Sequence, residues 1–275
     1  MSKVIREICV AGAVIDVAIK MTFRATGTGR KEKKNKTNEA VQKNNDRLAV
    51  KMLARLLNMN FFPGDFHTTL TYAVELSPEE AKHQLSLFIS RMRNEYRKLG
   101  KEFYYVAVTE YKNKRIHHHI VMNYIDSKII DKQWKLGHIW LSTLDRSRNY
   151  TELAEYLVKE TQQTFREPET STKRRWTASR NLKRPIVKRE RVSVAQLFAE
   201  PKAFKGYQID KDSVRKFENP ITRLEHKEYQ MIATDPVPRI KTWRKGKIVN
   251  RQEGYIRMAE IEQVSFEDLI SIDTL

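Results

Sequence analysis

The stretch that decides the fold consists of four segments: FHTTLTYAV (66–74), SPEEAKHQLSLFISRMRNEYRKLG (77–100), FYYVAVTE (103–110) and RIHHHIVMNY (115–124). The first, third and fourth segments are rich in β-branched and aromatic residues, which is typical of strands. The second begins with Ser-Pro-Glu-Glu, which supplies an N-cap, a proline in the first turn and the glutamate of a capping box, and it ends at a glycine. Its apolar residues recur on one helical face. The stretch therefore predicts the order strand, helix, strand, strand.

The chain around this stretch extends the pattern. A further helix is expected to begin near Asn149, which can cap it together with Glu152. The resulting order, β-α-β-β-α, predicts an α+β fold with a central antiparallel sheet of ferredoxin-like type flanked by helices. The sequence pattern predicts β-rich segments over residues 3–23 and a helix over residues 38–58. We expect three consecutive parts: an N-terminal β/α extension (1–60), a core that includes a basic segment (61–192) and a small C-terminal α+β accessory region (193–275).

The composition indicates a polyanionic partner. The 275 residues carry a net charge of +18, and 40% of them are hydrophobic, which is enough to build a core. Nucleic acid is the leading candidate partner. An anionic membrane is the alternative, but the longest apolar run, Ile8–Ile19, is short for a membrane span and contains Asp16, so we interpret it as a strand. The single cysteine, Cys9, excludes an internal disulfide and a Cys-based zinc site, and it fits a reducing cytosol.

Three consecutive histidines, His117, His118 and His119, lie in the last segment of the stretch. Side chains alternate across a strand, so His117 and His119 project from one face while His118 points away. His117 and His119 therefore form a candidate pair of metal ligands. The alternative is a partly exposed basic strand without a bound metal.

Hairpin geometry adds a carboxylate to this pair. If Glu110 pairs with Arg115 across a four-residue turn, or Tyr111 with Lys114 across a two-residue turn, His117 lies opposite Val108 and Glu110 lies one diagonal step away on the same face. A three-residue turn would break this relation. Two imidazoles and one carboxylate suit a divalent metal that also binds substrate. For Glu110 the alternative is a charged strand end.

Tyr156 and Lys159 lie one turn apart on the helix expected after Asn149, so their side chains are neighbours. A tyrosine with its ordinary pKa is a poor nucleophile, and an adjacent cation or metal that favours phenolate is what such chemistry needs. The pair is a candidate nucleophile with its assisting cation. Core packing of a tyrosine beside a solvated lysine is the alternative, and Tyr150 is a second candidate nucleophile that spacing leaves open.

The three motifs, in this order, resemble the HUH endonuclease superfamily, specifically the single-tyrosine rolling-circle replication initiators of plasmids and bacteriophages. Residues 66–72 resemble the first motif, residues 117–119 the His-hydrophobic-His metal motif, and Tyr156-x-x-Lys159 the nucleophile motif. The resemblance covers residues 60–190. The chain departs from the pattern at His118, where the superfamily has a bulky hydrophobic residue. We expect His118 to face the helical layer, although a register in which it is the ligand stays open.

The resemblance implies a DNA-nicking endonuclease that transfers a phosphodiester to tyrosine. A divalent metal, Mg or Mn, held by His117, His119 and Glu110, would polarise the scissile phosphate of single-stranded origin DNA. Tyr156 would attack it to leave a 5'-phosphotyrosine and a 3'-hydroxyl that primes synthesis, with Lys159 steadying the phenolate or the transition state. The setting implied is the cytoplasm of a bacterial host that carries a mobile element. A host helicase and polymerase are the expected partners, because the sequence has no Walker-type motif.

Candidate DNA contacts lie before and after the nucleophile. Thr69 and Thr71 share a strand face and are expected to contact the DNA backbone or support the metal site. Downstream, cationic side chains with an interleaved aromatic suit a single strand, which requires phosphate neutralisation and a stacking surface. A solvated surface segment is the alternative. The contacts expected there and beside the histidines are Arg115, Lys173, Arg174, Arg175, Trp176, Arg180 and Lys183.

Two other functions fit the same residues. Within the superfamily, the chain could be a plasmid-mobilising relaxase or a single-tyrosine transposase. From another class, it could be a basic nucleic-acid-binding protein without catalysis, in which the histidines pack in the core or bind a structural metal. Covalent capture of DNA by a tyrosine separates the catalytic functions from the last one.

Overall fold

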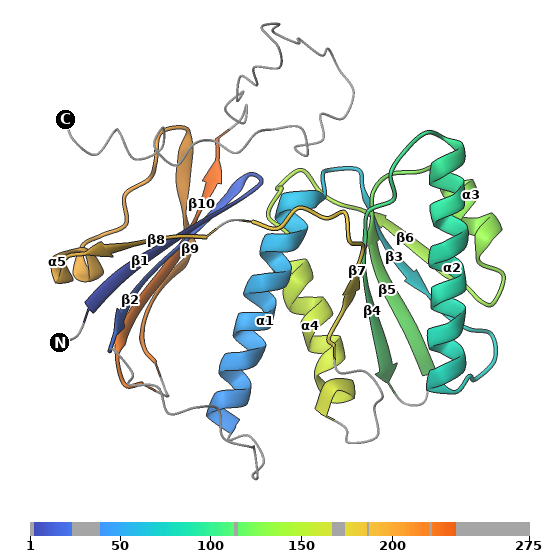
Figure 1. Ribbon diagram of the computed structural model, residues 1–275, viewed down its shortest axis with the longest axis horizontal. Coiled ribbons are helices and arrows are strands. Elements are labelled where there is room, and N and C mark those ends of the chain that lie inside the picture. Colours follow the sequence, from blue (N-terminus) through green and yellow to red (C-terminus); the bar gives the residue numbers. More distant parts are fainter. Residues whose placement is uncertain are drawn as a thin grey trace, which may run out of the picture. The chain divides into compact units, whose positions relative to one another are not determined.

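Two antiparallel five-stranded sheets and five helices make up the part of the chain that the computed structural model describes (Figure 1). The described residues are 3–23, 39–112, 115–166, 174–185, 187–219 and 222–234. The α+β fold class expected from the sequence is thereby confirmed. The chain divides into two compact units. Residues 49–183 form the central unit, and residues 1–48 together with 184–275 form the terminal unit.

The sheet of the central unit has the strand order β6-β3-β5-β4-β7, with every neighbouring pair antiparallel. Helices cover both faces of this sheet: α2 and α3 on one face, α4 and the second half of α1 on the other (Figure 1). The strands are β3 (Phe66–Leu70), β4 (Tyr105–Lys112), β5 (Arg115–Met122), β6 (Ile139–Thr143) and β7 (Thr177–Ala178). The helices are α1 (Glu39–Asn60), α2 (Pro78–Lys98), α3 (Ser127–Gln133) and α4 (Thr151–Arg166).

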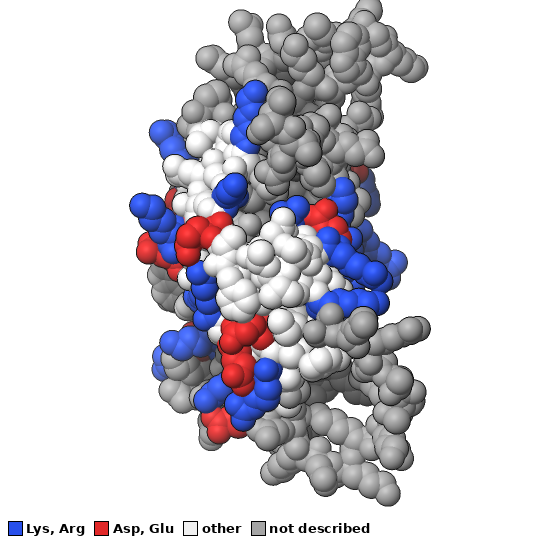
Figure 2. Space-filling view, turned by 90° about the vertical axis from the view of Figure 1, so that its left-hand side faces the viewer, with Lys and Arg blue, Asp and Glu red and all other residues white. Residues whose placement is uncertain are grey.

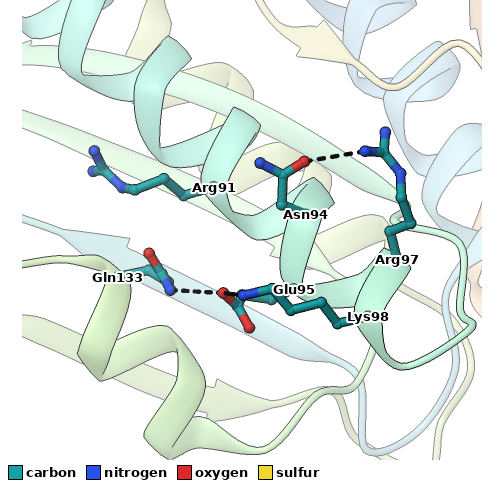
Figure 3. Close-up of a pocket in the computed structure, with 6 residues that line it drawn as sticks. All are labelled: Arg91, Asn94, Glu95, Arg97, Lys98 and Gln133. Atoms are coloured by element: carbon teal, nitrogen blue, oxygen red, sulfur yellow. Dashed lines mark hydrogen bonds and ion pairs between the residues drawn. The ribbon is translucent and has the colours of Figure 1, made fainter.

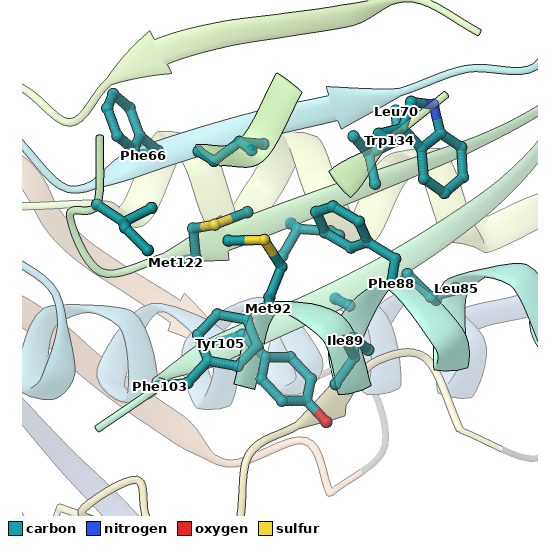
Figure 4. Close-up of a cluster of buried hydrophobic side chains, with 14 of the residues drawn as sticks. Phe66, Leu70, Leu85, Phe88, Ile89, Met92, Phe103, Tyr105, Met122 and Trp134 are labelled. Atoms are coloured by element: carbon teal, nitrogen blue, oxygen red, sulfur yellow. The ribbon is translucent and has the colours of Figure 1, made fainter. Parts of the chain in front are cut away.

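Strand alternation divides the interior of the central unit into two cores. Apolar residues of α2 and α3 pack on the face that carries Phe66, Leu70 and Met122, where Met92 and Phe88 lie in the middle of the cluster and Trp134 lies beside Leu70 (Figure 4). The other face carries valines at 106, 108 and 121 and packs against α1 and α4. Successive residues of one strand therefore enter different cores, as the pleat requires.

Helix α2 forms as the sequence predicts. The Ser77 side chain accepts a hydrogen bond from the backbone N–H of Glu80 at 3.2 Å, and the Glu80 carboxylate accepts one from the N–H of Ser77 at 2.9 Å. This reciprocal pair is the capping box expected from the Ser-Pro-Glu-Glu sequence. The helix is followed by Gly100 in the left-handed region, with φ of +64°, a conformation that glycine adopts without strain. The N-cap and the glycine therefore define the two ends of α2, and its buried apolar residues hold it against the sheet.

The sheet of the terminal unit has the strand order β8-β1-β2-β10-β9. Helix α5 packs on its apolar face, where Leu197 joins the core. The elements are β1 (Lys3–Ala11), β2 (Val14–Thr22), β8 (Val187–Val192), α5 (Val194–Phe198), β9 (Tyr207–Glu218) and β10 (Glu225–Ala233). The run Ile8–Ile19, interpreted as a strand, is a hairpin of β1 and β2 with Gly12 at a φ of 62° in its turn.

The division into units differs from the three consecutive parts expected from the sequence (1–60, 61–192 and 193–275). Strand β10 pairs with β2, and the basic strand β8 pairs with β1, so the two ends of the chain form one sheet. Pairing between strands about 200 residues apart leaves no local pattern in the sequence. The acidic segment 260–272 and the residues around Pro236 lie outside the described residues.

The second face of the terminal sheet is polar and largely covered. Glu7 is 8% exposed and accepts from Arg189 at 3.2 Å and from Lys20 at 3.4 Å. Asp16 is 6% exposed and accepts from the Gln230 side chain at 2.8 Å. These contacts satisfy the charged groups that the burial removes from water. At the surface, charged side chains of both signs surround an area without charged groups (Figure 2).

Among the described helices, none combines the length and the apolar character that crossing a membrane would require.

Candidate active site

The β4–β5 hairpin places Glu110 and the two outer histidines of the triplet on one face. Lys112 pairs with Arg115, Glu110 lies directly opposite His117, and His119 lies opposite Val108. The expected register, with His117 opposite Val108, is therefore wrong by two residues, because the turn lies one residue further along the chain than predicted. A shift of two leaves the faces unchanged. The conclusion that Glu110, His117 and His119 share a face is confirmed.

His119 is the centre of a buried hydrogen-bonded group. Its Nε2 lies 3.3 Å from Oε2 of Glu110, and its Nδ1 lies 3.2 Å from the hydroxyl of Thr69, which is opposite it on β3. His119 is 4% exposed and Glu110 is 7% exposed. Burial lowers the pKa of His119 to about 4, so its imidazole is neutral at physiological pH. Thr69 thus holds the ring with Nε2 directed at the carboxylate.

His118 points into the opposite core, as expected. Its Nε2 lies 2.8 Å from the hydroxyl of Tyr72, and its Nδ1 lies 3.0 Å from the hydroxyl of Thr109. The side chain is fully buried, and burial lowers its pKa to about 3. Both ring nitrogens are therefore occupied on the α2 face. The alternative register, in which His118 takes the place of its neighbours beside Glu110, is excluded by this placement.

His67 is a site residue that the sequence analysis did not assign. It lies two residues before Thr69 on β3, so it projects on the face of His119. The two imidazole rings are stacked with centroids 5.5 Å apart. Burial and the neighbouring His119 lower the pKa of His67 to about 4, and its Nε2 is buried without a hydrogen-bond partner among the described residues. Strand parity with Thr69 was the signal that could have identified it.

Tyr156 lies on α4 at the edge of this group. The inner face of the helix is formed by the buried residues Ala154, Leu157 and Val158. Tyr156 lies beside this face and remains 42% exposed. Its ring meets His119 edge-on at 5.3 Å and His67 at 6.1 Å between centroids. The structure therefore brings together the predicted nucleophile and two histidines, and leaves the tyrosine ring partly open to solvent.

Electrostatics around Tyr156 oppose its ionisation. Burial, then Glu160 and then Glu110, raise the pKa of the phenol above its ordinary value. Glu160 follows Tyr156 by four residues and so lies on the same helix face; it also favours the protonated forms of His117 and His119. Glu160 was not among the residues predicted for the site, although its spacing of four from Tyr156 is visible in the sequence. A cation at this site would offset both carboxylates and favour the phenolate.

Lys159 and Tyr150, the two other candidate residues of this region, lie in different surroundings. Lys159 is exposed on α4, and its side chain forms no hydrogen bond or ion pair with another described residue. Tyr150 is 3% exposed, and the hydroxyl has no hydrogen-bond partner within the described part of the chain. Burial raises its pKa. A hydroxyl enclosed in the α1–α4 core is not accessible to a phosphate, so the geometry favours Tyr156 as nucleophile.

The donor types in this group fit a divalent cation. The lowered pKa values keep the imidazoles of His67, His117 and His119 neutral, which is the form that binds metals, and Glu110 supplies an anionic oxygen. As they stand, however, no three His, Cys, Asp or Glu side chains within the described residues converge enough to hold a metal. The contact between His119 and Glu110 is in place, whereas His117 shares only their face.

The predicted DNA contacts are dispersed over the central unit. Thr71 is buried, and its hydroxyl forms hydrogen bonds of 3.1 Å with the backbone of His138. A Cβ added to Gly137 would come within 2.3 Å of the carbonyl oxygen of Thr71, so this strand end is tightly packed. Trp176 packs against the α1–α4 core. Arg115, Arg174 and Arg180 are exposed, Arg175 and Lys183 are half-buried, and Lys173 lies outside the described residues.

A separate groove of about 560 Å³ lies between α2 and α3, which cover the face opposite His119 (Figure 3). Glu95 at its centre accepts from Lys98 at 2.9 Å and from Gln133 at 3.1 Å. The Glu95 carboxylate therefore finds its partners within the groove. It contains none of the candidate site residues.

By class, the central unit is an α+β domain in which an accessible tyrosine lies against histidines and a carboxylate on an antiparallel sheet. Residues 65–165 match a family model of replication-associated proteins, the ORF2 type. The matched range contains the histidines, Glu110 and Tyr156, and the match supports similarity to Rep-type replication proteins. No curated protein and no solved structure is significantly similar to the chain.

Proposed function

We propose that the protein initiates rolling-circle replication by nicking and rejoining single-stranded origin DNA through a 5'-phosphotyrosine. The observation that carries this proposal is the contact of the exposed Tyr156 ring with His119, whose Nε2 faces Glu110, inside the region that matches a replication-associated family. A buried imidazole and carboxylate beside an accessible phenol suit phosphoryl transfer better than passive binding.

In the proposed reaction, the Tyr156 oxygen attacks the phosphorus of the scissile phosphodiester. The bond from phosphorus to the 3' oxygen breaks, the phenolic proton leaves, and the 3' oxygen takes up a proton to become the primer hydroxyl. Attack by a 3'-hydroxyl on the phosphotyrosine reverses these steps and rejoins a strand. The phosphodiester energy is conserved in the tyrosine ester, so no nucleotide cofactor is consumed.

Glu110, His117 and His119 are the residues proposed to hold Mg or Mn, which would supply a Lewis acid for the phosphate and a charge that favours phenolate. Thr69 keeps the His119 ring oriented through Nδ1. The raised pKa of Tyr156 means that the phenol must lose its proton during attack. Lys159, one turn along α4, is proposed to neutralise charge on the phosphate once DNA is bound. A host helicase and polymerase would extend the primer.

Covalent capture of DNA tests the proposal. An origin-containing oligonucleotide incubated with the protein and Mn should give an adduct that survives denaturing electrophoresis in the wild type and in Tyr150→Phe. Tyr156→Phe should abolish the adduct and leave DNA binding within about twofold. Adduct formation by Tyr156→Phe would move the nucleophile to another residue.

A non-catalytic DNA-binding role is the second candidate. It is favoured by the lack of a converged metal cluster within the described residues. Tight binding to single strands, with no adduct on any origin sequence and no Mn binding by calorimetry, would support it. Binding of Mn that is lost in both His119→Ala and Glu110→Gln would support the catalytic site instead.

A further inference from the structure

An open groove of about 830 Å³ lies in the terminal unit, between the first turns of α1 and the second half of β9. Its described lining residues include four cations and one acid: Lys43, Arg47, Arg215, Lys216 and Glu39. Glu39 pairs with Lys43 at 2.7 Å, but both side chains are more than three-quarters exposed, so solvent weakens that pair. Lys216 pairs with Glu200 at 2.9 Å, so the excess positive charge of the groove comes from Arg215 and from the weakly paired Lys43, and it suits an anionic ligand.

The guanidinium of Arg47 is held in a fixed orientation inside the groove. It forms an ion pair with Glu228 and lies 3.3 Å from the side-chain oxygen of Asn44. Its central carbon is 4.9 Å from the centroid of the Phe217 ring, which in turn contacts the His226 ring at 5.5 Å. A guanidinium supported by an aromatic ring offers a flat cationic surface on which a nucleobase can stack.

Arg215 supplies an unpaired cation beside this surface. It lies opposite Glu228 across the β9–β10 pair, and its side chain is exposed. Among the described residues, none forms an ion pair or hydrogen bond with the Arg215 side chain. Its five donors are therefore available for a phosphate.

We propose that this groove is a second DNA-binding site, which takes single-stranded DNA with a base stacked on Arg47 and a phosphate on Arg215. A concave cationic groove with a stacking surface is the arrangement that single strands use, whereas the bases of a duplex are already stacked and could not reach Arg47. None of the candidate active-site residues lines the groove. The proposed binding involves no nicking, so it stands or falls independently of the proposed function.

Fluorescence anisotropy with the full chain and a labelled oligothymidine of about 16 nucleotides tests the phosphate contact. Arg215→Glu should weaken binding about tenfold and lower the slope of log affinity against log salt by about 0.7, the value for one phosphate on a single strand. Lys211→Glu makes the same charge change on an exposed residue of β9 outside the groove, and it should weaken binding less than about twofold. Equal losses in the two variants would overturn the proposal.

An abasic oligonucleotide of the same length tests the stacking contact. Arg47→Lys keeps the charge and the partner Glu228 but loses the planar group, so it should weaken oligothymidine binding about fivefold or more and leave abasic binding unchanged. Arg215→Glu should weaken both ligands. Equal weakening of both by Arg47→Lys would refute the stacked base, and an effect of Arg215→Glu on duplex alone would refute the single strand.

Adduct formation on saturating origin DNA separates this inference from the proposed function. Arg215→Glu and Arg47→Lys should form the Tyr156 adduct like the wild type at saturation. Loss of every adduct while Arg215-dependent binding persists would refute the nicking reaction and leave the groove assignment standing.

Discussion

His118 and His119 are adjacent on β5, but their side chains lie on opposite faces of the sheet and have different partners. His118 uses both nitrogens for Tyr72 and Thr109 in the α2 core. His119 uses one nitrogen for Thr69 and directs the other at Glu110 on the α4 face. Because the strand pleat separates the two rings, one imidazole serves packing while the other stays available for a ligand.

The buried His118 should make stability depend on pH. Its folded pKa of about 3 lies below the ordinary value of 6.5, so between these values the unfolded chain binds a proton that the folded chain does not. The free energy of unfolding should therefore fall as the pH is lowered through this window, by up to about 1.4 kcal/mol per pH unit. Urea unfolding measured from pH 7 to pH 4 checks this.

His118→Leu should reduce that slope, leaving the contributions of His67 and His119, whose pKa values are also lowered. Replacement of the exposed His83 by Leu is the matched control and should leave the slope unchanged. An identical pH dependence in both variants would mean that His118 is not buried as a neutral imidazole.

Thr69 allows a direct test of the two roles suggested by its strand. Thr69→Val keeps the shape but removes the hydroxyl that holds His119, and we expect it to weaken Mn binding about tenfold or more. Thr69→Ser retains the hydroxyl and should bind Mn nearly as well as the wild type. Isothermal titration calorimetry gives both affinities. If Thr69 contacts the DNA backbone instead, Thr69→Val will weaken DNA binding and leave Mn binding unchanged.

Among the elements, α2 depends most clearly on its cap. Ser77→Ala removes a side-chain acceptor from the backbone N–H of Glu80 and breaks the capping box. The free energy of unfolding of the central unit should fall by about 1 kcal/mol. Ser90→Ala, on an exposed position within the same helix, is the control and should have an effect within about 0.5 kcal/mol. Chemical denaturation measures both, and equal effects would show that the cap contributes nothing.

Elements with strong local signals could be predicted from the sequence. The capping box and apolar periodicity define α2, and alternation defines β4 and β5, because these signals arise within one turn or one strand pair. Strands β6 and β7 and helices α3 and α5 are too short to produce a distinct period. Strand β8 lies in a basic segment whose composition suggests contacts with DNA. In the structure, charged residues of β8 instead form ion pairs with Arg6 and Glu7 of β1.

The candidate site could be predicted only in part for the same reason. Parity on one hairpin brought Glu110 to His117 and His119 even though the register was wrong by two residues. Parity with Thr69 marks the face of His67 on β3, but the contact of His67 with His119 required the pairing of β3 with β5, and the contact of Tyr156 with His119 required the packing of α4 on the sheet. Both are tertiary relations between separate elements, which the spacing within any one segment does not contain.

At the scale of the whole molecule, the chain leaves one sheet and returns to it. Strands β1 and β2 precede the central unit, and β8, β9 and β10 follow it before pairing with them. Ile8, Ile15 and Val17 of the first hairpin share one core with Tyr229 and Met231 of β10, which pair with Val17 and Ile15, and with Leu197 of α5. The β1–β2 hairpin alone cannot bury this apolar face, so its stability should depend on residues more than 200 positions away.

Met231→Ala should therefore destabilise both ends of the chain together. Met231 is fully buried on β10, and truncating it should cost about 2–5 kcal/mol. We expect hydrogen exchange, measured by mass spectrometry, to accelerate in peptides from residues 3–22 as well as in those from residues 187–233, with peptides from 66–122 unchanged. Met92→Ala, at an equally buried position of the central core, should produce the reverse pattern. Acceleration confined to residues 187–233 would show that the two ends fold separately, because a shared sheet must lose protection on every strand that depends on β10.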